Sequence, residues 1–178
     1  MLQLEKIAVL SAAGKVLVTV ILNRIKEAVD RLLRQEQDGF RKKRSCCEQV
    51  FALRQIIEKA QARDKSLHLN FIYFRKAFDC VHRDTLWAIL RAYGLPEKIT
   101  NIIRSFYGDS RSTIRVNGSL GEWFGVISGV RQGCVLSPLL FAVAIDWVTK
   151  RAVEAASRSG LKRTEGDIVT LPTILFDR

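Results

Sequence analysis

The sequence predicts an α+β fold that is rich in helix and carries a small antiparallel sheet. Apolar residues recur at helical spacing in several stretches, one apolar stretch alternates like a strand, and an Asn-Gly pair separates two short β-like runs. The chain has 178 residues, of which 48% are hydrophobic, so it can form one globular domain with a sizeable core. No repeat, low-complexity tract or linker interrupts the sequence.

Two amphipathic helices are expected in the first third of the chain. The first covers residues 15–33, and a polar loop that contains glycine follows at residues 35–45. The second covers Cys46–Ala62, and its apolar side is formed by Val50, Leu53, Ile57 and Ala60. Residues 67–74, LHLNFIYF, are predicted to be a strand because they alternate and are rich in aromatic and β-branched side chains.

Two short helices are expected next. Residues 83–94 form a helix that Gly94 ends, with His82 interpreted as a capping or surface residue. Trp87 lies on the apolar face of this helix and is expected in the core. Residues 96–107 form the second helix, which has a proline in its first turn.

A hairpin and a long helix complete the predicted elements. The hairpin covers residues 112–126, turns at the Asn-Gly pair, and carries Trp123, which is expected in the core. Ser137 is placed to cap the last helix, which runs to about Ala156. Residues 157–178 are rich in turn-forming residues and contain one candidate strand.

The charge balance favours an anionic partner. Twenty-nine Lys and Arg against eighteen Asp and Glu give a formal net charge of +11, which attracts polyanions. Nucleic acid is the first partner to consider and an anionic membrane surface the second, and charge alone does not choose between them. Because 26% of the residues are charged, the composition favours neither a disordered chain nor a membrane protein.

The cysteine spacing argues against a metal or disulfide framework. The four cysteines are Cys46, Cys47, Cys80 and Cys134, and they form no C-x-x-C pair. A reducing intracellular compartment, nuclear or cytoplasmic, is therefore the simpler expectation. The apolar residues 6–22 are similar to a signal peptide, but Lys15 interrupts them and the pattern continues into an amphipathic helix.

Three stretches, in this order, carry a family resemblance: DGFRKKRS at 38–45, FIYFRKAFD at 71–79 and SGVRQGCVLSPLLF at 128–141. They resemble the reverse transcriptase domain of non-LTR (LINE-type) retrotransposons, and the resemblance extends to about Ala156. It implies a single partial domain over residues 1–178 with part of a right-hand polymerase fold. Residues 1–65 would be fingers-like, and residues 66–178 an incomplete palm that ends before the family's Y-A-D-D hairpin and thumb.

The resemblance also implies an RNA-directed DNA polymerase that uses two Mg²⁺ ions held by carboxylates. The family pattern F-x-D-F-x-K-A-F-D places a metal-ligand aspartate where this chain has Tyr73, and a phenol with a pKa of about 10 stays neutral at pH 7. Where the second catalytic motif is expected, the chain reads DIVTLPTILFDR, so Asp177 receives no catalytic role. No catalytic residue, metal ligand or cofactor is therefore expected in this chain.

Four residues correspond to the family's nucleotide-binding positions: Phe78, Asp79, Gln132 and Gly133. In the family an aromatic side chain at the position of Phe78 lies under the sugar and selects deoxynucleotides. The alternatives are that Phe78 is a core residue at a strand end, and that Gln132 and Gly133 form only a helix-entry turn.

The basic run RKKR at 41–44 has three interpretations. By family position Phe40, Arg41 and Arg44 face the template strand, and arginine forks fit phosphates well. A nuclear localisation patch and a solvated loop are the other two. Lys43 stands where the family often has glycine, which predicts a stiffer loop.

The main hypothesis is an inactive relative of these polymerases with residual binding of RNA and DNA primer–template and no membrane partner. The alternatives are one piece of an active reverse transcriptase completed by other sequence, a non-catalytic host module that binds a protein at the incomplete palm edge, and a product without a selected role. The edge of an unfinished sheet favours a protein partner because its backbone groups are unpaired.

Overall fold

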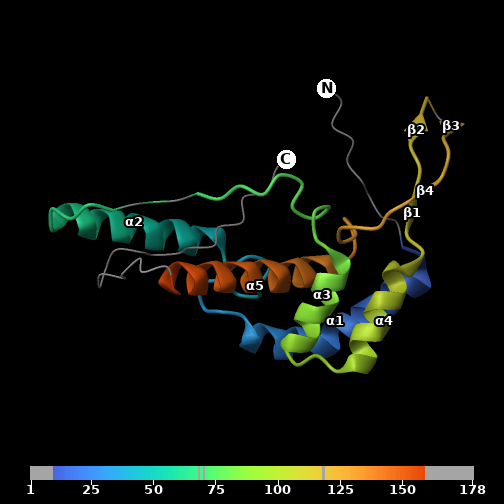
Figure 1. The fold of residues 1–178 in the computed structure, drawn as a ribbon, viewed down its shortest axis with the longest axis horizontal. Coiled ribbons are helices and arrows are strands. Elements are labelled where there is room, and N and C mark those ends of the chain that lie inside the picture. Colours follow the sequence, from blue (N-terminus) through green and yellow to red (C-terminus); the bar gives the residue numbers. More distant parts are fainter. Residues whose placement is uncertain (1–9, 68, 70, 118, 159–178) are drawn as a thin grey trace.

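The computed structural model describes residues 10–67, 69, 71–117 and 119–158. Within them the chain is helix-rich with short antiparallel strand pairs, which confirms the predicted α+β class in outline (Figure 1). The helices are α1 (Ala12–Leu32), α2 (Cys46–Ala62), α3 (Arg83–Ala92), α4 (Glu97–Gly108) and α5 (Ser137–Arg158). The strands are β1 (Arg111–Ser112), β2 (Arg115–Val116), β3 (Ser119–Leu120) and β4 (Phe124–Gly125).

The core lies between four of the five helices. Helix α3 packs against both α4 and α5, and α1 contributes a buried stripe at the spacing expected of an amphipathic helix (Figure 1). The buried side chains include Val29, Leu86, Ile103, Leu140 and Phe141. Helix α2 is peripheral, because among its residues only Gln49 is buried and Val50, expected on its apolar side, is exposed.

Local sequence signals explain the ends of the helices. Ser45 and Glu48 form a reciprocal capping box at the start of α2. The His82 side chain accepts a hydrogen bond from the backbone N–H of Thr85, which confirms its predicted capping role at α3. Gly94, with φ +77°, follows the end of α3 as predicted. Helix α5 begins at Ser137 itself, whose hydroxyl lies 3.4 Å from the Tyr107 hydroxyl.

The strand predicted at residues 67–74 is wrong for the part that the structure describes. Residues 67, 69 and 71–74 have no regular secondary structure, and 70% of Phe71 and 54% of Tyr73 are exposed. A strand is stabilised by a neighbouring ladder, and among the described residues the paired strands all lie between Arg111 and Gly125. The candidate strand after residue 157 lies outside the described residues.

The hairpin is confirmed as two short ladders, β1 with β4 and β2 with β3, and Asn117 at the turn has φ 49°. Its expected core residue is wrong: Trp123 is 62% exposed, whereas Trp87 in α3 is buried as predicted. The hairpin projects from the α4 end of the molecule (Figure 1). Two-stranded hairpins are only marginally stable alone, so its attachment to the core matters.

Buried Arg83 attaches the hairpin to the core. Its guanidinium donates hydrogen bonds to the carbonyl oxygens of Tyr107 at 3.1 Å, Val126 at 2.6 Å and Gly129 at 3.0 Å. Arg131 adds bonds to the carbonyl of Phe106 and the hydroxyl of Ser110. Two cations therefore satisfy carbonyls at the C-terminal end of α4, where the helix dipole favours positive charge. Burial lowers the pKa of Arg83 below its usual value.

Within the described part of the chain, no helix is both long and apolar enough to cross a bilayer.

Replacing Arg83 by methionine tests this attachment. We expect the free energy of unfolding to fall by about 2–4 kcal/mol, because three buried carbonyl groups lose their donor. Urea unfolding followed by circular dichroism measures the change. The matched control is Arg91→Met on the exposed side of the same helix, which should stay within about 0.5 kcal/mol of the parent. Equal effects of both substitutions would contradict the assigned role of Arg83.

Candidate nucleic-acid interface

Three phenylalanines from distant parts of the chain form one aromatic cluster. Phe78, in the turn at residues 75–80, stacks on Phe141 of α5 with ring centroids 4.7 Å apart and planes 14° apart. Phe40, from the loop between α1 and α2, meets both rings edge-on at 5.9 and 6.1 Å. Such stacked and edge-to-face pairs are favourable arrangements of aromatic rings. The cluster therefore joins the basic loop to the turn that carries Phe78 and Asp79, two of the residues predicted to bind a nucleotide.

The backbone of the basic loop is strained at two positions. Phe40 and Lys43 both have φ 62°, in the left-handed region that favours glycine. For a bulky residue such as Phe40 this is a rare conformation, which persists only where the surroundings hold it. The ring contacts with Phe78 and Phe141 stabilise Phe40 in this conformation.

Gly129 brings the turn at 75–80 against the loop that leads into α5. Its backbone N–H donates to the Val81 carbonyl at 2.8 Å, and the N–H of Val130 donates to the Phe78 carbonyl at 2.8 Å. A Cβ at position 129 would lie 2.8 Å from the Cα of Asp79, and φ is +81°. Only glycine suits this close approach. Sequence reasoning missed this residue, although it lies inside the quoted motif SGVRQG.

The four residues predicted to bind a nucleotide lie on two adjoining segments. Phe78 and Asp79 are half-buried in the turn, whereas Gln132 and Gly133 are exposed in the loop that begins at Gly129. Gly133 has φ +91°, which fits a helix-entry turn as well as a close approach by a ligand. The structure therefore fits both interpretations of this loop.

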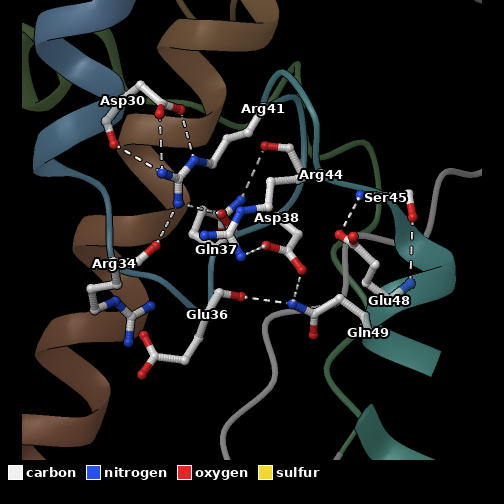
Figure 2. A network of polar contacts seen from close by, with 11 residues as sticks. Asp30, Arg34, Glu36, Gln37, Asp38, Arg41, Arg44, Ser45, Glu48 and Gln49 are labelled. Atoms are coloured by element: carbon white, nitrogen blue, oxygen red, sulfur yellow. Dashed lines mark hydrogen bonds and ion pairs between the residues drawn. The ribbon is translucent and has the colours of Figure 1, made fainter. Parts of the chain in front are cut away.

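Arg41 points into the protein and not outward, which differs from the expectation for a template contact (Figure 2). Its Nε and Nη2 donate to the two carboxylate oxygens of Asp30 at 2.7 and 3.2 Å, and Nη2 also donates to the Asp30 carbonyl. Nη1 donates to the carbonyls of Arg34 and Gln37. These hydrogen bonds raise the pKa of Arg41 and lower the pKa of Asp30. Arg41 therefore closes the loop onto the end of α1.

Arg44 is also engaged within the protein. Its Nη1 lies 3.3 Å from the Asp38 carboxylate, which in turn accepts a hydrogen bond from Gln49 of α2 at 2.6 Å (Figure 2). Two of the four cations in the basic run, Arg41 and Arg44, are thus ion-paired; the Arg41 side chain is 9% exposed, whereas Lys42, Lys43 and Arg44 are exposed.

The residue predicted to stand at the family's metal-ligand position does not fit a Mg²⁺ site. Tyr73 supplies a neutral phenol, and Mg²⁺ requires hard, preferably anionic oxygen ligands. Asp79 lies in the turn packed on Gly129. Within the described residues, no three or more His, Cys, Asp or Glu side chains gather in a group that could hold a metal.

Comparison with known proteins decides the family. The sequence matches the family described as reverse transcriptase (RNA-dependent DNA polymerase) over residues 5–164. This chain belongs to the reverse transcriptase family. The match confirms the resemblance found in the three quoted stretches.

The curated relatives of this reverse transcriptase chain come from mobile elements. It is 33% identical over 135 residues to the Pol polyprotein from the type-1 retrotransposable element R2 of Nasonia vitripennis, which aligns 76% of the chain and 13% of that protein. It is 32% identical over 169 residues to a probable RNA-directed DNA polymerase from transposon BS of Drosophila melanogaster, with shares of 93% and 18%. The chain therefore spans less than a fifth of the length of these relatives.

The close approach at Gly129 predicts a large cost for added volume. Gly129→Ala should lower the free energy of unfolding by about 2–4 kcal/mol, because the new methyl group meets the backbone of Phe78 and Asp79 and the left-handed φ adds strain. The control is Gly108→Ala in α4, where nothing lies within 4 Å of the new Cβ. Thermal or urea unfolding measures both, and an equal response would refute the packing argument.

The Asp30–Arg41 pair predicts a dependence on pH. The folded-state pKa of Asp30 is lowered, chiefly by the hydrogen bond from Arg41. The contribution of this carboxylate to the free energy of unfolding is therefore fully present above its ordinary pKa of about 3.9 and is lost as the pH falls through the lowered value. In Asp30→Asn the free energy of unfolding should therefore decrease less steeply than in the parent chain as the pH falls below about 4. Urea unfolding across this range measures it, with exposed Glu122→Gln as control. Parallel curves for the parent chain and Asp30→Asn would be inconsistent with the pair.

Proposed function

We propose that this chain binds an RNA–DNA primer–template and does not itself catalyse DNA synthesis. The binding surface consists of the turn at residues 75–80, the loop at 129–133 and exposed Lys43. The observation that carries the proposal is the contact of these two segments at Gly129, which brings the turn with Phe78 and Asp79 against the loop that leads to Gln132 and Gly133. The family match and the net charge of +11 support a nucleic-acid partner.

In this proposal the chain is part of a right-hand polymerase. Residues 1–65 would correspond to fingers and residues 66–178 to part of a palm. The aromatic cluster supports this division, since Phe40 of the first part contacts Phe78 and Phe141 of the second. The nucleic acid would then lie where the two parts meet.

The proposed lack of catalysis depends on Tyr73. A separate chain could supply other metal ligands, but not the carboxylate of this segment. The alternative, one piece of an active polymerase, therefore requires a different ligand at this position. Primer extension with Mg²⁺ and deoxynucleotides tests the point, and extension above background by the purified chain would overturn the proposed inactivity.

A protein partner is the second candidate, favoured by the exposed apolar stretch. Leu69, Phe71, Ile72, Tyr73 and Phe74 are all exposed, and such contiguous apolar surface is typical of interaction sites. Basic residues flank the stretch, Lys65 on one side and Arg75 and Lys76 on the other. The partner that fits is an extended apolar segment with acidic residues at its ends.

Primer–template binding is measured by fluorescence anisotropy across salt concentrations. The double substitution Lys43→Gln with Arg75→Gln should weaken hybrid binding and reduce the salt slope by about two, one unit for each lost phosphate contact. The control, Lys59→Gln with Lys98→Gln, removes the same charge from exposed positions on α2 and α4. If the control has the same effect, binding follows net charge alone and the proposed surface is wrong.

A further inference from the structure

A cavity of about 370 Å³ lies between α1, the basic loop and the start of α5. Its volume lies in the range that holds small molecules and cofactors. The apolar part of its lining consists of Leu22, Phe40, Val135, Pro138 and Leu139. This wall combines one aromatic ring with aliphatic groups and a proline, so a flat apolar ligand fits it.

The polar part of the lining is predominantly basic. Lys26, Arg31, Arg41 and Lys42 line the cavity together with two carboxylates, Glu27 and Asp30. Arg41 and Asp30 neutralise each other through their bidentate pair. Three cations therefore remain against one carboxylate, and this excess favours an anionic ligand.

Phe40 belongs to the apolar part of the lining and precedes the basic residues Arg41 and Lys42 in the same loop. Its left-handed backbone is held by edge-on contacts with Phe78 and Phe141, yet 37% of the residue stays exposed. Strained residues held in this way are concentrated at ligand sites. An aromatic ring beside several cations is the combination that binds a base and its phosphate in single-stranded nucleic acid.

We propose that this cavity holds one unstacked nucleotide of a single-stranded overhang, with the base against Phe40 and Pro138 and the phosphate at Lys26, Arg31 and Lys42. This inference rests on the proposed primer–template binding and adds a site to it. It also moves the basic contacts away from Arg41 and Arg44, which the family pattern suggests, to α1 and Lys42, because the two arginines are ion-paired internally.

The test compares two RNA–DNA hybrids with the same duplex, one blunt and one with a single-stranded template overhang. The parent chain should bind the overhang form about tenfold more tightly, the gain expected from one stacked base. An overhang whose nucleotides lack bases should lose most of that gain. A peptide with aromatic and acidic residues serves as competitor. Displacement of the overhang hybrid by a low concentration of this peptide would favour a protein ligand and overturn the inference.

Two pairs of variants separate the cavity from the rest of the surface. Val135→Trp fills the cavity without a change of charge and should abolish the overhang preference while leaving blunt-hybrid binding within about twofold. Val148→Trp is the control, at an exposed position on α5 outside the cavity. Arg31→Gln with Lys42→Gln should also reduce the preference, whereas Lys59→Gln with Lys98→Gln should retain it.

The outcomes distinguish the two proposals. Blunt-hybrid binding without an overhang preference in the parent chain, or a preference that survives Val135→Trp, overturns the cavity assignment and leaves the proposed function standing. Absence of binding to either hybrid overturns both. An overhang preference lost in Val135→Trp and kept in Val148→Trp supports the nucleotide site.

Discussion

The buried carboxylate of Asp146 holds the arrangement on which the candidate interface depends. It is 1% exposed on α5, and it accepts hydrogen bonds from the Arg34 side chain at 2.9 Å and the Tyr93 hydroxyl at 2.7 Å. A buried charge is costly unless it is paired, so the segments that follow α1 and α3, which carry Arg34 and Tyr93, are held against α5. Burial and this carboxylate raise the pKa of Tyr93, which keeps the hydroxyl a donor. The backbone carbonyl of Arg34 also accepts a hydrogen bond from Arg41, so the basic loop is connected to Asp146 through Arg34.

The engagement of the arginines determines which cations remain for a ligand. Arg41 and Arg44 satisfy Asp30 and Asp38, and their charges therefore support the loop and its link to α2. Lys42 and Lys43, between them in the sequence, remain exposed. The basic run therefore contains two arginines that form ion pairs within the chain and two exposed lysines. Net charge describes the field around the molecule, but the pairing of individual side chains decides where a phosphate can bind.

Sequence patterns predicted the features that depend on neighbouring residues. The helices, the caps at His82 and Gly94, and the hairpin turn all follow from spacing and turn chemistry within a few residues. The strand prediction at 67–74 failed because a strand also requires a pairing partner, which local patterns do not reveal, and no strand pairs with these residues in the described part of the chain. The direction of Arg41 and the role of Gly129 depend likewise on Asp30 and Asp79, which periodicity does not reveal.

The proposed separation of binding from chemistry has a physical basis in the placement of these residues. The sequence resemblance implies a metal-binding carboxylate at the position of Tyr73, which lies in a segment outside the regular elements. The proposed binding depends instead on the aromatic cluster, the close contact at Gly129 and exposed cations, and the first two are held by the packed core. Stacking and phosphate contacts need no metal. In the proposed function, a tyrosine at position 73 removes the chemistry but leaves the ring contact of Phe141 and the hydrogen bonds that position Phe78 in place, so the proposed binding does not depend on catalysis.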